Sequence, residues 1–468
     1  MIAISLAEVA AAIDGVLATY GDDAADMIVS GPVQTDSREV ETGSIFFAMT
    51  GEVTDGHLFA ASALDNGAAL LVVEHRIDLP VSQIIVDDAV AALAALARHV
   101  VATVRSSSAL RVIGITGSNG KTTTKNMLRA VLTPHGPTVA PRESFNNQVG
   151  APLSMLSVDH DTKYLVIEMG ASGIGEIARI VAIATPDISV VLKVGLAHAG
   201  EFGGIDATQR AKSEIVTELP SDAVAVLNID DERVAAMAER TAARPVWFGL
   251  DDRADVRADD LRATASGTSF VVSIGSEHRP VRLRILGEHH VMNALATLAV
   301  ANELGLPLDQ TIAALESVPR AERWRMEVLP RTDGVVVIND AYNASPDSMA
   351  AALKTLAQIV VPGQRSVAIL GEMAELGEYA DEEHDRIGRL VVRLNIQKLV
   401  VVGHGARHIH NAAGLEGSWD GESVLVGTPD EAYDLISGEL RAGDVVLVKS
   451  SKAANLRFLG DRIGEVQA

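Results

Sequence analysis

Residues 109–124 have the order of elements that forms a phosphate-binding loop. The β-branched run 112–115 predicts a buried strand, the stretch 117–120 predicts a glycine-rich turn, and Lys121 begins a segment of helical composition. Backbone N–H groups of such a loop, together with the start of the helix, attract anionic oxygens. Lys121 can reach the β- and γ-phosphates of a nucleotide, and the Thr122 hydroxyl can bind Mg²⁺.

The glycine spacing in this loop departs from the general nucleotide-binding pattern. That pattern has a glycine five residues before Gly120, where this chain has Ile115. The glycines stand at 114, 117 and 120 instead. Glycine-rich loops without a ligand are common, but the order of strand, loop and helix favours phosphate binding, and the spacing indicates a particular variant of the loop.

Two carboxylates close apolar runs further along the chain. Glu168 ends the run 164–168, where it can hold Mg²⁺ or serve as a helix cap or solvated side chain. Asp340 ends the run 335–340, where it can bind ribose hydroxyls or belong to a well-capped helix start. Ligands of open α/β sheets lie at the carboxyl ends of the strands, so both positions are candidates for chemistry.

His198 and Lys212 are ambiguous when they are taken by themselves. His198 lies in a glycine-rich segment after the apolar run 188–195, where a metal-binding or phosphate-proximal role and an ordinary polar role are equally consistent with the spacing. Lys212 has the setting of a solvated helix lysine.

The composition restricts the class of protein. A formal charge of −23 argues against sequence-independent binding to nucleic acid or to a membrane surface. The chain has no cysteine, which excludes disulfides and thiolate metal sites. No Lys or Arg precedes Arg38, so a signal peptide is not expected, and Arg98 and His99 interrupt the Ala-rich stretch 89–104, which argues against a membrane span. These features predict a soluble cytoplasmic protein, with a monomer as the default.

The spacing of apolar runs predicts an α/β protein of three domains. Residues 1–107 mix short strands and helices and end in the possible linker Ser106–Ser108. Residues 108–318 carry the phosphate loop and further runs typical of buried parallel strands. Residues 319–468 contain four more apolar runs without a phosphate loop, which predicts a second, Rossmann-like sheet.

Several motifs together resemble the Mur ligase family, the ATP-dependent amide-forming enzymes of bacterial cell-wall precursor synthesis. The resemblance covers nearly the whole chain and begins with the loop GITGSNGKTTT. Within the family, some segments are similar to the member that adds D-alanyl-D-alanine to a UDP-N-acetylmuramoyl-tripeptide. These segments are ESFNNQVGAPLSML (143–156), IEMGASGIGEI (167–177), AHAGEFG (197–203), RAKSEI (210–215), NDAYNASPDSM (339–349) and LGEMAELGE (370–378).

The resemblance implies a role for each matching residue. ATP-binding residues would be Gly117, Ser118, Asn119, Gly120, Lys121, Thr122, Thr123, Asn293, Arg325 and Asp340. Substrate-binding residues would be Ser37, Arg38, Asn146, Asn147, Ser172, Asn343 and Lys452. Mg²⁺ would be held by Thr122, Glu168, His198 and Lys212, the last as an anionic carbamate, and the catalytic residues would be Lys121, Lys212 and His198.

Some positions depart from the family pattern. His290 and Lys193 stand where the family usually has Asn, and KSSK (449–452) replaces K-G-S-R. Lys452 lacks the planar fork of an arginine, which weakens the expected recognition of a carboxylate.

Two alternatives to this function also remain. The first is a sister amide ligase or a folate-type polyglutamate synthetase, and the second is a nucleotide-binding switch or scaffold without ligase activity.

Overall fold

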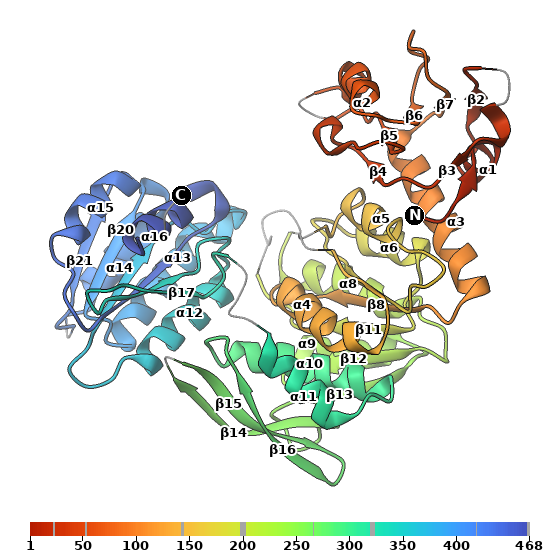
Figure 1. Ribbon diagram of the computed structural model, residues 1–468. Helices are drawn as coiled ribbons and strands as arrows, with labels where there is room; N and C mark the ends of the chain where they lie inside the picture. The colour runs from red at the N-terminus through yellow and green to blue at the C-terminus, as the bar shows by residue number, and fades with distance from the viewer. Residues whose placement is uncertain are drawn as a thin grey trace.

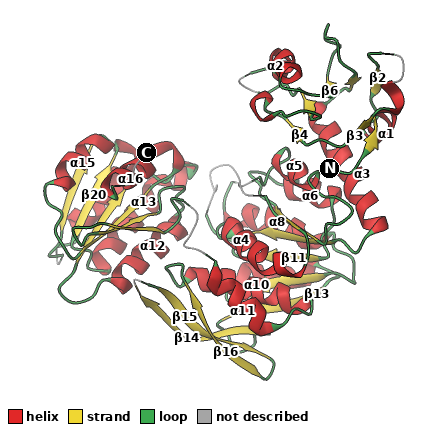
Figure 2. Ribbon diagram, in the orientation of Figure 1, coloured by secondary structure: helices red, strands yellow, loops and turns green. Residues whose placement is uncertain are grey.

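The computed structural model describes residues 1–21, 24–51, 54–141, 145–196, 203–264, 266–318, 323–417 and 419–465. Three α/β regions follow one another along the chain, each with its own main sheet (Figure 1). Helices flank the strands in all three regions (Figure 2). The predicted α/β fold is confirmed, and the domain limits near residues 107 and 318 stay predictions.

The N-terminal region is built on a five-stranded sheet with the order β2-β7-β6-β5-β4, beside the short antiparallel pair β1-β3. Ser5 and Glu8 form a capping box that begins the first helix. The elements are β1 Ile4–Ser5, α1 Leu6–Ala12, β2 Val16–Ala18, β3 Ile28–Val29, β4 Val33–Gln34, β5 Ile45–Phe47, α2 Ala60–Asp65, β6 Leu70–Val73, β7 Gln83–Ile85 and α3 Ala89–Ser107.

Helix α3 connects the N-terminal region to the central one. It is the one helix within the described ranges that is long and apolar enough to cross a membrane, yet it contacts α1 of its own region and α5 and α6 of the next. Its apolar face, including Leu93, Leu96 and Val100, is buried in these contacts. The predicted linker at Ser106–Ser108 is wrong, because Ser106 and Ser107 belong to the last turn of this helix. Their hydroxyls donate hydrogen bonds to the backbone carbonyls of Thr103 and Val104.

The central region contains a nine-stranded sheet with the order β16-β15-β14-β13-β12-β11-β8-β10-β9. Pairing is parallel from β9 to β14, as predicted for this region. Strands β14 to β16 add an antiparallel ribbon, which alternates buried and exposed residues and was not predicted. The strands are β8 Arg111–Thr116, β9 Thr138–Val139, β10 Tyr164–Glu168, β11 Ile188–Val191, β12 Val224–Asn228, β13 Arg244–Gly249, β14 Val256–Thr264, β15 Gly267–Ile274 and β16 Glu277–Leu283.

Helices cover both faces of the parallel part of this sheet (Figure 1). The helices of the region are α4 Lys121–Leu132, α5 Gly150–Met155, α6 Glu176–Ile183, α8 Ile205–Thr217, α9 Glu232–Ala235, α10 His289–Glu303 and α11 Leu308–Ser317. One face packs α4 and α10, and its apolar residues form one core cluster with the ribbon β14 to β16.

The C-terminal region has a six-stranded sheet with the order β17-β18-β22-β19-β20-β21. The four predicted apolar runs are its inner parallel strands, whereas the edge strands β17 and β21 were not predicted, because β21 is partly exposed and carries no continuous apolar run. The elements are β17 Glu327–Pro330, β18 Val336–Asn339, α12 Pro346–Ile359, β19 Arg365–Leu370, α13 Ala380–Arg393, β20 Lys398–Val402, α14 Arg407–Leu415, β21 Glu422–Val426, α15 Pro429–Ser437, β22 Asp444–Lys449 and α16 Leu456–Ile463.

The hydrophobic clusters do not correspond one to one with the three main sheets. A single cluster joins Ile45 and Leu70 of the N-terminal sheet, the buried face of α3, and Leu165 of β10 in the central sheet. The apolar residues of the C-terminal sheet belong to separate clusters. The N-terminal and central regions therefore share one large cluster, whereas the clusters of the C-terminal region include only Leu286 from outside that region.

Candidate active site

The predicted phosphate-binding loop joins β8 to α4. Gly120 caps the helix with φ +89°, and an added Cβ would lie 2.3 Å from Oδ1 of Asn293, so only glycine fits. The Lys121 ammonium donates to the carbonyl oxygen of Gly117 at 2.7 Å. The loop therefore directs its backbone and one ammonium group toward the same space, with Asn293 of α10 beside it.

Glu168 at the end of β10 lies directly behind the start of α4. The Thr122 hydroxyl donates to Oε2 of Glu168 at 3.2 Å, and the Lys125 ammonium lies 3.0 Å from Oε1. The side chains of Lys125 and Glu168 are fully buried. Lys125 and Glu168 form a buried ion pair that holds the carboxylate against the Thr122 hydroxyl. Lys125 was not predicted as a site residue.

Lys212 of α8 is buried and close to the loop. Burial, with a smaller contribution from repulsion by Lys121, lowers the pKa of Lys212 to about 7. Burial also lowers the pKa of Lys121, while attraction by Glu168 works in the opposite direction. The prediction of a solvated helix lysine is therefore wrong: the turn of α8 that carries Lys212 faces the protein interior, not solvent.

The C-terminal region contributes a second set of polar side chains. Asp340, after β18, accepts a hydrogen bond from the backbone N–H of Met326 at 2.9 Å and from the Lys449 ammonium at 2.6 Å. The Arg325 guanidinium lies 4.2 Å from the ring centroid of Tyr342. Lys449 was not predicted as a site residue, although it ends strand β22, which is the position where polar residues were sought.

The phosphate loop and these side chains of the C-terminal region line one cavity of about 320 Å³. It brings together most of the predicted ATP-binding residues and two predicted substrate-binding residues. The lining residues are Ser118, Asn119, Gly120, Lys121, Thr122, Thr123, Asn146, His289, His290, Asn293, Arg325, Met326, Asp340, Tyr342, Asn343, Ser348 and Lys449.

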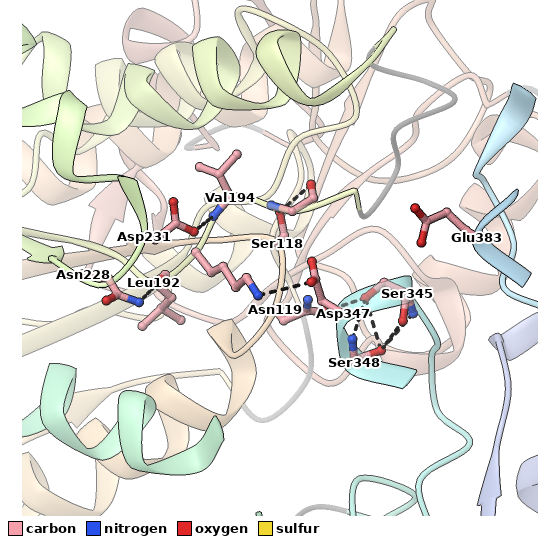
Figure 3. Close-up of polar contacts among 12 residues, drawn as sticks. Ser118, Asn119, Leu192, Val194, Asn228, Asp231, Ser345, Asp347, Ser348 and Glu383 are labelled. Atoms are coloured by element: carbon pink, nitrogen blue, oxygen red, sulfur yellow. Dashed lines mark hydrogen bonds and ion pairs between the residues drawn. The ribbon is translucent and has the colours of Figure 1, made fainter. Parts of the chain in front are cut away.

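Direct contacts join the two sides of this cavity. Figure 3 shows Ser345 and Asp347 at the start of α12 facing Ser118 and Asn119 of the loop, and the Ser345 hydroxyl donates to Oδ1 of Asn119 at 3.2 Å. The Lys193 ammonium, in the segment after β11, lies 3.2 Å from Oδ1 of Asp347. The C-terminal region thus reaches the phosphate loop through the first turn of one helix.

A second cavity of about 740 Å³ lies between the N-terminal and central regions. Asp36 lines it from one side and Asn147 from the other. Asn146, the preceding residue, lines the first cavity and contacts Gly170 after β10 through its backbone carbonyl. Asn146 therefore lines the first cavity and Asn147 the second, so one short segment of the chain contributes to both cavities.

Four further predicted site residues, Ser37, Arg38, Ser172 and Lys452, do not line either cavity. Ser37 is buried beneath the turn that Asp36 begins, and Arg38 is largely exposed and paired with Asp36. Ser172 is exposed and bonded to Glu176 at the start of α6. Lys452 is exposed, with its ammonium 6.0 Å from the ring of Tyr342. His198 lies outside the described residues, so its predicted role stays a prediction.

Metal-binding groups are sparse in this site. Within the ranges that the structure describes, no three His, Cys, Asp or Glu side chains gather as a metal-binding cluster. The oxygens of Thr122 and Glu168 lie together, and Mg²⁺ sites that include substrate phosphates need only one or two protein carboxylates. The donor set therefore fits a magnesium ion held jointly with a nucleotide.

Comparison with known protein families accounts for nearly the whole chain. Residues 32–114 match the model of the Mur ligase family catalytic domain, residues 115–301 the Mur ligase middle domain, and residues 324–452 the Mur ligase glutamate ligase domain. The chain belongs to the Mur ligase family. The resemblance found in the sequence is confirmed.

Individual Mur ligases are similar along their full length. The UDP-N-acetylmuramoyl-tripeptide–D-alanyl-D-alanine ligase of Mycobacterium tuberculosis strain ATCC 25618 / H37Rv is 42% identical, over 99% of this chain and 98% of the relative. The enzyme of the same name from Escherichia coli strain K12 is 32% identical, over 97% of each chain.

Solved Mur ligase structures have the same arrangement of regions. A crystal structure of MurF from Acinetobacter baumannii has a TM-score of 0.87 and 31% identity, over 98% of both chains. The MurF ligase of Thermotoga maritima, solved in complex with ADP, has a TM-score of 0.80 and 28% identity, over 93% of this chain and 98% of that one.

Proposed function

We propose that this Mur ligase joins D-alanyl-D-alanine to the terminal carboxylate of UDP-N-acetylmuramoyl-tripeptide and couples this step to the cleavage of ATP to ADP and phosphate. The product is the pentapeptide precursor of peptidoglycan. The observation that carries this function is the first cavity, in which Lys121 and Thr122 of the phosphate loop face Arg325 and Asp340 of the C-terminal region. Full-length similarity to enzymes of that name supports the choice of substrates.

The reaction follows from the charges in this cavity. The tripeptide carboxylate attacks the γ-phosphate, a new O–P bond forms, and the bond to ADP breaks. Lys121 and Arg325 offset the repulsion between the two anions and stabilise charge on the transferred group. The amine of the dipeptide then attacks the acyl phosphate, forms the amide, loses a proton and releases phosphate. We expect Asn293, which lies beside Gly120, to contact the adenine, and Asp340 to contact the ribose, as the family resemblance implies.

Magnesium is part of the proposal. Thr122 and Glu168 would hold it, with His198 and the carbamate of Lys212 as the further ligands that the family resemblance implies. When bound, Mg²⁺ neutralises phosphate charge. Carbamylation of Lys212 requires an amine that gives up its proton, and a buried position beside another ammonium group favours the neutral amine.

The second cavity is proposed to receive the UDP-linked substrate. The segment around Asp36 and the residue Asn147 line this cavity, and the neighbouring Asn146 lines the first cavity. Ser37 and Arg38 lie next to this wall, and rotation of Arg38 away from Asp36 would bring its guanidinium to an anionic ligand. We propose a cytoplasmic monomer that acts on these small molecules, without nucleic acid and without insertion into a membrane.

Phosphate release tests this function. The enzyme is supplied with ATP, Mg²⁺ and UDP-N-acetylmuramoyl-tripeptide, with or without D-alanyl-D-alanine, and the product is weighed by mass spectrometry. We expect phosphate release to require both the tripeptide and D-alanyl-D-alanine, and the product to be the pentapeptide. Turnover with a single amino acid would assign a sister ligase, and binding of ATP without any turnover would contradict the ligase function.

A further inference from the structure

A group of aromatic and cationic side chains extends outward from the first cavity over the C-terminal region. We call it the outer basic group: Trp324, Tyr342, Lys452, Arg457 and Phe458. The ring centroid of Tyr342 lies 4.2 Å from Cζ of Arg325 and 6.0 Å from Nζ of Lys452, so at most about 10 Å separates these two cations. The group therefore begins beside the cavity that holds the predicted phosphate site.

Several contacts hold the side chain of Arg457 in place. Its Nη1 donates to the backbone carbonyl of Lys452 at 2.9 Å. Its Cζ lies 4.5 Å from the ring centroid of Phe458 and 5.5 Å from that of Trp324. Trp324 is in turn fixed because its Nε1 donates to both carboxylate oxygens of Asp461, at 3.0 Å and 2.9 Å.

Arg457 has no acidic partner among the residues that the structure describes. Among the residues that the structure describes, no carboxylate forms an ion pair with Arg457 or with Lys452, whereas the neighbouring Arg323 pairs with Asp461. A guanidinium that aromatic rings hold in place keeps its N–H groups available for a carboxylate. Lys452 and Arg457 stand five residues apart, and neither has an acidic partner among the described residues. In a chain of charge −23, this indicates a site for an anion.

We propose that Arg457, together with Lys452, binds the carboxylate of the incoming D-alanyl-D-alanine. This inference rests on the proposed function. About 6 Å separates the amine from the carboxylate of an extended dipeptide, and at most about 10 Å separates Lys452 from Arg325. A carboxylate at Lys452 therefore leaves the amine within reach of the part of the cavity beside Arg325. Arg457 supplies the planar fork that Lys452 lacks at its own position.

Steady-state kinetics with Arg457→Gln test the proposal. Loss of a charge-assisted contact is expected to raise the KM for D-alanyl-D-alanine about 10-fold to 100-fold. The KM values for ATP and for UDP-N-acetylmuramoyl-tripeptide should stay within about twofold, and Arg457→Lys should recover part of the loss. Arg462→Gln is the matched control, because Arg462 lies on the same helix and stacks on Tyr433, but pairs with Asp430.

A second measurement separates recognition from a structural role. The wild type should prefer D-alanyl-D-alanine strongly over its C-terminal carboxamide, and Arg457→Gln should lose that preference. A variant that keeps the wild-type KM for the dipeptide, that raises all three KM values together, or that changes only the KM for the UDP-linked substrate would overturn the proposal. A wild type that does not use D-alanyl-D-alanine at all would instead overturn the proposed function, and this is seen before any variant is made.

Discussion

Lys193 of the central region and Asp347 of the C-terminal region form an ion pair beside the phosphate loop, with Nζ 3.2 Å from Oδ1. The two side chains are 46% and 31% exposed, so the pair contributes little stability and is screened by salt. Such a contact suits a region that must close over an acyl phosphate and then open to release product.

Lys193→Asn should loosen the contact between these two regions. Without nucleotide, small-angle X-ray scattering is expected to show a larger radius of gyration for the variant than for the wild type at low salt. The wild type should approach the same value in about 0.5 M salt, because the pair is exposed. Identical scattering of the two proteins at low salt would show that the pair does not hold the regions together.

Glu168→Gln should affect both stability and magnesium use. The substitution leaves the Lys125 ammonium buried without its carboxylate partner, which costs about 3–5 kcal/mol. The double variant Glu168→Gln with Lys125→Met should recover most of that stability while its ligase activity stays low. Denaturation and the Mg²⁺ dependence of activity measure the two effects separately, and recovery of activity in the double variant would exclude Glu168 as a metal ligand.

Lys212→Met should remove activity without weakening the fold. The pKa of Lys212 falls to about 7 in the folded protein from an ordinary 10.5, so the unfolded chain binds the proton more strongly between these values and stability rises with pH across them. In CO₂-free buffer, the melting temperature of the wild type should therefore rise more from pH 7 to pH 9 than that of the variant. Lys163→Met, at an exposed position, is the control and should behave like the wild type. A large loss of stability in Lys212→Met at pH 7 would contradict this account.

Acid should destabilise the protein through His289. Burial lowers the pKa of His289 to about 4 from an ordinary 6.5, so the unfolded chain takes up the proton first and stability falls as the pH drops through this window, by up to about 3 kcal/mol. The fall in melting temperature between pH 7 and pH 5 should be smaller in His289→Asn. His160→Asn, at an exposed position, should keep the full fall; an equal fall in all three proteins would rule out this contribution.

The sequence was informative where one local feature determines the structure. Gly120 must adopt positive φ at the start of α4, and the inner strands are continuous apolar runs, so the loop and the ends of β10 and β18 could be located. Edge strands such as β21 escaped because a strand with one exposed side carries a weaker pattern.

Contacts between distant residues could not be predicted in the same way. Asp340 and Lys449 form an ion pair because they follow or end neighbouring strands of the C-terminal sheet. Lys193 and Asp347 form one because the first turn of α12 lies beside the segment after β11. Lys212 shows the same limit, since a lysine on an amphipathic helix gives no sign in the sequence that its turn faces the interior. Family resemblance supplied that residue where local pattern could not.

The core that α3 shares between the N-terminal and central sheets has a consequence for how the chain unfolds. Three main sheets are described, but the five-stranded N-terminal sheet cannot separate without exposing the apolar residues of α3 and of β10 at the same time. The C-terminal sheet, with its own clusters, can melt alone. Calorimetry should therefore resolve two cooperative units, and hydrogen exchange in the C-terminal strands should be independent of exchange in the other two sheets, which exchange together.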